Sequence, residues 1–183
     1  TGQILPEFIE DFFKKNKKIK IKLLITMYLG GYPENIEKFY NLKIKYKFLI
    51  LEDSCHAFGA SYISNKRKYM IGSCKHSDIS TFSFHPVKTI TTGEGGAITT
   101  NNKIYYQIMK NLRSHGIIRN KSYWNYQIKH PGFNYRISDI NCALGSKQIE
   151  KTRFFLIERK KIYKNYIKLF KNLNKGIVSF PKY

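Results

Sequence analysis

One lysine of the sequence has an unusual setting. Lys88 lies in the run Ser80–Ala97, which consists mainly of small, hydroxyl and apolar residues, whereas most other lysines are scattered over polar segments. A lysine in a poorly solvated place has a lowered pKa and can form an imine with a carbonyl compound. Ser83 offers a hydroxyl to a phosphate, and the three glycines within 93–96 allow a flat ligand or another strand to approach the backbone closely. An ordinary glycine-rich turn before a strand is the structural alternative.

A second candidate is the acid that follows an apolar segment. Asp53 comes just after Phe48–Leu51, a predicted buried strand, and open α/β sheets hold their ligands at the carboxyl ends of strands. An acid in this position is also a common helix cap or turn residue, and His56 is compatible with a core histidine. Neither residue indicates a site by itself.

Together, the acid and the lysine indicate a specific chemistry. A buried carboxylate can pair with a protonated pyridine nitrogen, while a nearby lysine can hold an aldehyde as an imine and move protons. Asp53 and Lys88 therefore predict pyridoxal phosphate chemistry. The phosphate-binding patterns GxxxxGK[ST] and GxGxxG are absent from the sequence.

Hydrophobic periodicity predicts the elements that position these residues. We predict helices over 5–15, 34–46, 102–114, 137–150 and 152–173, and strands over 19–29, 48–51, 79–84 and 97–100. The first strand–helix–strand unit implies parallel strands that are buried on both faces, so the fold class is α/β. The last helix carries a stripe of large apolar residues, which we assign to the core. These are Phe155, Ile162, Tyr166, Leu169 and Leu173.

Length and composition exclude several classes of protein. The 183 residues suit one domain or slightly more, and 42% hydrophobic with 15% aromatic residues argues against a disordered chain. No apolar run approaches the ~18 residues of a spanning helix, and no signal peptide is visible. The three cysteines are widely spaced, without a CxxC pair, which predicts reduced thiols rather than a disulfide framework. We expect a cytoplasmic protein with no membrane partner and no metal.

The net charge of +21 raises the alternative of a nucleic-acid-binding domain. However, the 33 basic residues comprise 27 lysines and only 6 arginines, and arginine is the residue that supplies the bidentate fork to bases. The lysines are also scattered rather than interleaved with aromatic residues. We therefore expect a solvated basic surface and no nucleic-acid partner, although the charge would favour an anionic small ligand.

Three segments resemble the DegT/DnrJ/StrS family of sugar-nucleotide aminotransferases. They are Glu52–Ala60, Ser77–Ala97 and Gly132–Gly145, in the family's order. The resemblance implies a fold-type I pyridoxal-phosphate enzyme with a three-layer α/β/α large domain. The second segment is most similar to the pseudaminic-acid branch, which aminates C4 of a UDP-linked 4-keto-6-deoxy-N-acetyl sugar with glutamate as the donor. Related dehydratases carry histidine where this chain has Lys88.

The resemblance also implies roles for individual residues. Lys88 matches the lysine that binds the cofactor covalently, and Asp53 matches the carboxylate that faces the pyridine nitrogen. His56 occupies a position beside the cofactor ring, and Ser83 matches a serine that contacts the phosphate. Asn134 matches an asparagine that reaches the cofactor phosphate of the neighbouring subunit, which implies a homodimer with shared active sites.

Family members are roughly twice as long as this chain. We therefore expect residues 1–150 to form the second half of the cofactor-binding large domain, and residues 151–183 to form a connecting helix and the start of a small domain. The Gly-Thr turn and ring-stacking aromatic of the family would lie outside this segment. An inactive remnant of the family is a further alternative.

Overall fold

The computed structural model describes residues 2–119, 125–128, 130–171 and 173. No helix within these ranges combines the length and apolar character needed to cross a bilayer.

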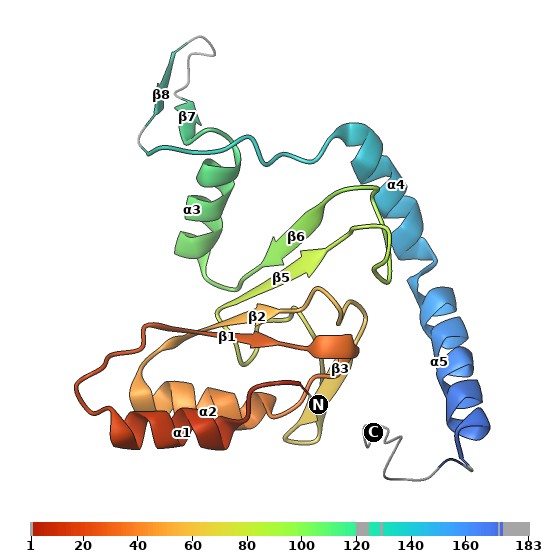
Figure 1. Cartoon of the computed structure of the whole chain (residues 1–183). Coiled ribbons are helices and arrows are strands. Elements are labelled where there is room, and N and C mark those ends of the chain that lie inside the picture. The colour runs from red at the N-terminus through yellow and green to blue at the C-terminus, as the bar shows by residue number, and fades with distance from the viewer. Residues whose placement is uncertain (1, 120–124, 129, 172, 174–183) are drawn as a thin grey trace.

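A four-stranded sheet forms the centre of the molecule (Figure 1). Its order is β1 (Leu23–Met27), β2 (Leu49–Asp53), β5 (Ile79–Ser83) and β6 (Gly96–Thr99). The first three strands are parallel and β6 runs antiparallel to β5. Because the parallel strands are in register, their carboxyl ends meet at one edge of the sheet.

Two helices cover one face of this sheet (Figure 1). They are α1 (Pro6–Lys15) and α2 (Ile36–Tyr46). The core beneath them joins Ile9 and Phe39 of the helices to Leu24 and Ile50 of the strands. Alternation along a strand sends every second side chain into this core.

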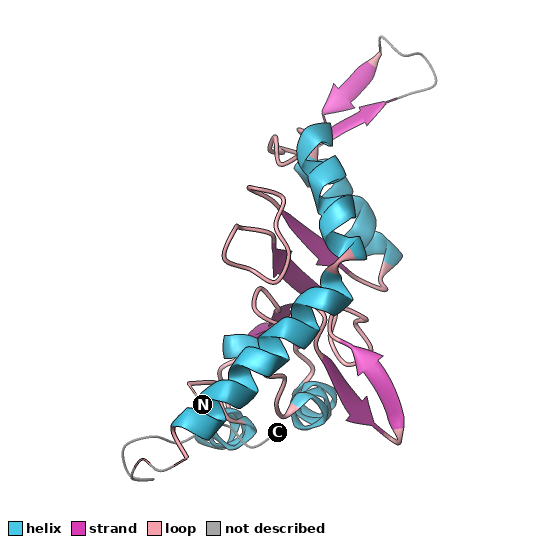
Figure 2. Ribbon diagram, turned by 90° about the vertical axis from the view of Figure 1, so that its right-hand side faces the viewer, coloured by secondary structure: helices cyan, strands magenta, loops and turns pink. Residues whose placement is uncertain are grey.

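The remaining elements surround the sheet. They are the short helix η1 (Leu29–Gly31), the hairpins β3 (Ser61–Ser64) with β4 (Arg67–Met70) and β7 (Ile117–Arg119) with β8 (Tyr126–Ile128), and the helices α3 (Lys103–Arg113), α4 (Asp139–Glu150) and α5 (Thr152–Leu169). Figures 1 and 2 show that α4 and α5 follow one another as a helical arm along one end of the sheet. Side-chain caps begin α3 at Asn102 and α4 at Ser138.

The five predicted helices and four predicted strands are all confirmed, and most of their ends lie within a few residues of the predicted ones. The predicted strand 19–29 forms only over Leu23–Met27, and the last helix ends at Leu169. The β3–β4 hairpin was not predicted. The division of the chain at residue 150 stays a prediction.

Two predictions about the core are wrong. The sheet is not buried on both faces, because α1 and α2 pack on one side only, and Leu23, Ile25 and Met27 of β1 are 40–58% exposed on the other. The stripe on α5 is not core either, since the described part of α5 holds no buried residue and Leu169 is 74% exposed. The helix runs along the end of the sheet, and its Leu156 packs against Gly59 in the loop that follows β2.

A carboxyl group is buried inside the sheet's covered face. Glu52 of β2 is 3% exposed, and its Oε1 accepts a hydrogen bond of 2.8 Å from the Tyr28 hydroxyl. Within the described residues, its Oε2 has no hydrogen-bond partner. Burial raises the pKa of Glu52 above the ordinary 4.5, although the Tyr28 hydroxyl acts in the opposite direction.

The raised pKa of Glu52 predicts how stability depends on pH. The folded chain holds the proton more tightly than the unfolded chain, so the contribution is present below about pH 4.5 and is lost as pH rises. From pH 5 to pH 8, the wild type should lose about 1.4 kcal/mol of unfolding free energy for each unit of raised pKa. A Glu52→Gln variant should lack this loss, which urea unfolding followed by circular dichroism at both pH values would measure.

Glu7→Gln is the matched control, because Glu7 is a solvent-exposed carboxyl that pairs with Lys38. Its pH dependence should follow that of the wild type. If Glu52→Gln also followed the wild type, the buried carboxyl would not hold its proton in the folded state.

Candidate active site

The predicted acid and serine lie at the same edge of the sheet. Asp53 ends β2 and is paired in register with Thr81 of β5, two residues before Ser83 ends that strand. Just after the end of β2, the Ser54 backbone N–H donates a hydrogen bond of 2.9 Å to the Thr81 carbonyl. The carboxyl ends of these parallel strands thus place Asp53 and Ser83 at the same edge of the sheet.

The Asp53 carboxylate is fixed by the chain that follows it. Its Oδ1 accepts a hydrogen bond of 3.1 Å from the backbone N–H of Cys55. This is the local side-chain-to-backbone bond that aspartate forms at turns. The side chain is half-buried, so one carboxylate oxygen is oriented while the group remains reachable.

The lysine is carried by a loop that closes on itself. Between β5 and β6, the backbone N–H of Phe84 donates to Gly95 O at 2.8 Å, and Thr92 N–H donates to Phe84 O at 3.0 Å. Ile90, 1% exposed, anchors the loop in the core. Lys88 itself is half-buried, so the desolvation predicted for it is only partial. We call residues 84–95 the lysine loop.

Both predicted catalytic groups act on the pKa of the Cys55 thiol. Burial raises its pKa to about 11, and the Asp53 carboxylate adds to this increase, while the Lys88 ammonium and the Ser83 backbone lower it. Asp53, Lys88 and the Ser83 backbone are therefore the neighbouring groups that set the pKa of this thiol. The sequence pattern does not single out Cys55.

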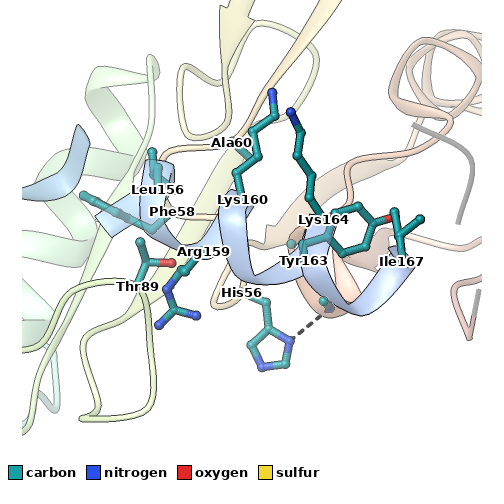
Figure 3. A pocket seen from close by; sticks show the side chains of 12 residues that line it. His56, Phe58, Ala60, Thr89, Leu156, Arg159, Lys160, Tyr163, Lys164 and Ile167 are labelled. Atoms are coloured by element: carbon teal, nitrogen blue, oxygen red, sulfur yellow. Dashed lines mark hydrogen bonds between the residues drawn. The ribbon is translucent and has the colours of Figure 1, made fainter. Parts of the chain in front are cut away.

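His56 lies on the rim of this site. It is solvent-exposed, and its Nδ1 accepts a long hydrogen bond of 3.3 Å from the backbone N–H of Gly30. The neighbouring Gly31 has φ +82°, and a Cβ there would lie 2.6 Å from the His56 carbonyl oxygen. Only glycine fits this approach. A cavity of about 770 Å³ separates this rim from α5, with Arg159 on its far wall (Figure 3).

The structure does not bring Asn134 into this group. Asn134 forms a β-bridge with Ser114, which follows α3. Figure 1 shows the end of α3 and the β5–β6 loop at opposite ends of the sheet. The prediction that Asn134 serves a neighbouring subunit is therefore untested by the single chain.

The remaining side chains suit pyridoxal phosphate as a donor set. A carboxylate fits the protonated pyridine nitrogen, an amine fits the aldehyde, and a hydroxyl fits the phosphate. Asp53 at the end of β2, Ser83 at the end of β5 and Lys88 in the loop that follows supply these three groups. In the described parts of the chain, no three His, Cys, Asp or Glu side chains gather as a metal site.

The placement of Cys55 predicts its reactivity. With a pKa of about 11, Cys55 should react slowly with iodoacetamide at pH 8.5, because little thiolate is present. Asp53→Asn should speed alkylation by roughly threefold to tenfold, since the carboxylate raises the thiol pKa, and Lys88→Met should slow it. Mass spectrometry of the Cys55 peptide would measure each rate.

Cys142 serves as the internal reference because it is exposed on α4. Its alkylation rate should not change in either variant. Equal Cys55 rates in the wild type, Asp53→Asn and Lys88→Met would mean that the two charges do not flank the thiol.

Comparison with known proteins gives the relatives of this chain. A transaminase from Campylobacter jejuni (serotype O:23/36, strain 81-176), named for UDP-4-amino-4,6-dideoxy-N-acetyl-beta-L-altrosamine, is 43% identical over 141 residues. That match covers 77% of this chain and 36% of the relative. GDP-perosamine synthase of Escherichia coli O157:H7 is 36% identical over 154 residues, covering 84% of this chain and 40% of the relative. The chain thus spans little more than a third of the length of these curated relatives.

A solved structure supports the same relationship. Helicobacter pylori PseC, an aminotransferase involved in the biosynthesis of pseudoaminic acid, superposes with a TM-score of 0.82 at 33% identity. The match covers 93% of this chain and 43% of PseC, so the β-sheet and its surrounding helices have the fold of the fold-type I pyridoxal-phosphate aminotransferases. The family model matches residues 1–182. The chain therefore belongs to the DegT/DnrJ/EryC1/StrS aminotransferase family.

Proposed function

We propose that this chain is the lysine-bearing part of a pyridoxal-phosphate-dependent sugar-nucleotide aminotransferase. The observation that carries the proposal is the placement of Asp53 and Ser83 at the carboxyl ends of the paired strands β2 and β5, with Lys88 in the loop that directly follows Ser83. The named relatives, which include transaminases of UDP- and GDP-linked sugars, support the reaction class.

In this proposal each residue has one task. Pyridoxal phosphate, when bound, supplies an electron sink for the carbon that exchanges its amino group. The Lys88 amine holds the cofactor and moves protons as a general base and acid. The Asp53 carboxylate keeps the ring nitrogen protonated, because an adjacent negative charge favours the cationic form. The Ser83 hydroxyl donates to the phosphate, and His56 lies beside the ring.

The substrate and assembly belong to the same proposal. We infer that C4 of a UDP-linked 4-keto-6-deoxy-N-acetylhexosamine is aminated, with glutamate as the donor, because transaminases named for a UDP-altrosamine are among the relatives at 42–43% identity. A homodimer would place Asn134 in the partner's site, which agrees with its separation from Lys88 in the single chain. Cytoplasmic location stays a prediction.

Cofactor trapping tests the proposal. The full product of the reading frame that encodes this chain is incubated with pyridoxal phosphate, reduced with borohydride and mapped by peptide mass spectrometry. Lys88 should carry most of the label, because the proposal pairs this amine with the Asp53 carboxylate, which would stabilise the protonated ring nitrogen of the bound cofactor. Lys88→Ala should lower total labelling on the order of tenfold.

Lys103→Ala is the control, since Lys103 is an exposed lysine at the start of α3. Its labelling pattern should match that of the wild type. Weak labelling spread over surface lysines, with Lys88 unmodified, would contradict the proposal and favour an inactive remnant of the family.

A further inference from the structure

The helical arm touches the lysine loop through three side chains. Asn141 of α4 donates from its Nδ2 to the Glu94 carbonyl at 3.1 Å, and Gln148 of α4 accepts at Oε1 from the Thr91 backbone N–H at 3.4 Å. Arg159 of α5 donates from its Nη2 to the carbonyl oxygen of Lys88 at 3.1 Å. All three partners in the loop are backbone atoms.

The contacts follow one another in opposite order along the two segments. On the arm, residues 141 and 148 lie seven residues apart on α4, which is about two helical turns, and residue 159 lies on α5, beyond the break at Lys151. On the loop, the bonded residues 94, 91 and 88 follow at intervals of three. The arm therefore runs antiparallel to the lysine loop and bonds it at three successive places.

Close packing supports this alignment between the bonds. Gly145 of α4 is buried, and a Cβ there would lie 2.7 Å from Thr92 Cγ2. A Cβ on Gly95 would lie 2.8 Å from Ile137 Cδ1, just before α4. The small residues allow the arm and the loop to approach closely, so the hydrogen bonds belong to an extended contact.

Arg159 differs from the other cations of α5 in its direction. In Figure 3 the Arg159 side chain extends toward Thr89 and lies on the same side of the helix as His56, whereas Lys160 and Lys164 extend on the opposite side. Arg159 is also the one contact of the three that carries a charge and bonds the peptide of Lys88 itself. A guanidinium presents donors in a fixed fork and orients its acceptor better than an ammonium.

We propose that Arg159 is a positioning residue, which holds the Lys88 peptide through its carbonyl oxygen and so directs the Lys88 amine toward Asp53. The arm fixes the loop from outside, while Ile90 and the Phe84–Gly95 bond fix it from within. The importance of Arg159 for catalysis rests on the proposed function. The positioning of Lys88 by Arg159 does not, because it concerns only residues of this chain.

Two readouts test the proposal on the full product of the reading frame. The first is the alkylation rate of Cys55 in the absence of cofactor, because the Lys88 ammonium lowers the pKa of that thiol. In Arg159→Met, the rate should fall toward the Lys88→Met value, while the Cys142 rate stays constant. The second is borohydride-trapped labelling of Lys88, which should fall by roughly threefold to tenfold, as for the loss of one charge-assisted hydrogen bond.

Arg153→Met is the matched control, because Arg153 is an exposed arginine on the same helix. It should leave both readouts at the wild-type value. Arg159→Lys, which keeps the charge but has a shorter reach and no fork, should restore both readouts in part. If circular dichroism showed that Arg159→Met does not fold, the two readouts would be compared between Arg159→Lys and Arg153→Lys instead. Lower values in Arg159→Lys would support the positioning role, and equal values would contradict it.

The outcomes separate this inference from the proposed function. If Arg159→Met had the same Cys55 alkylation rate and the same Lys88 labelling as the wild type, the positioning role would be overturned. The aminotransferase proposal would not be affected. Absence of Lys88 labelling in the wild type would overturn the aminotransferase proposal, while the Cys55 rate would still decide whether Arg159 positions Lys88.

Discussion

The alternation of side chains along β2 is the constraint on which the rest of the structure depends. Glu52 and Asp53 are adjacent, so they must point to opposite faces of the sheet. Glu52 is buried under α2 and the neighbouring loops, where its carboxyl is bonded to Tyr28. Asp53 faces the other side at the strand end, half-buried and bonded to the Cys55 N–H. A shift of one residue in register would exchange these two carboxyls and remove the site.

The alternation along β2 fixes the position of Asp53 but not that of Lys88, because the lysine is on a loop. Twelve residues separate the end of β5 from the start of β6, and a loop of this length has many conformations. Its base is closed by backbone bonds at Phe84, and its buried side chain is Ile90. The outer contacts come from α4 and α5, 47 to 71 residues further along the chain. Lys88 is thus positioned jointly by the sheet and by the arm.

The sequence allowed prediction of what depends on local pattern. Periodicity located the strands that end at Asp53 and Ser83, and the three family segments located Lys88. It did not reveal that the second face of the sheet and the stripe on α5 are exposed, because burial depends on which elements lie opposite. The contact between Arg159 and the lysine loop could not be predicted for the same reason. Its partner is a backbone carbonyl of Lys88, and no residue type marks such a partner in a sequence.

The large positive charge and the site have different physical roles. With 33 basic and 12 acidic side chains, the chain attracts anions in general, and a nucleotide sugar carries a diphosphate. Such a field raises the rate of encounter but orients nothing, since lysines are mobile and well-hydrated point charges. Orientation requires a group with fixed geometry. On α5 the side chains of Lys160 and Lys164 extend from one side of the helix, whereas the Arg159 fork extends on the other and is bonded to the peptide of Lys88. If Arg159 positions Lys88 as proposed, its geometry constrains the site more strongly than the scattered lysines do.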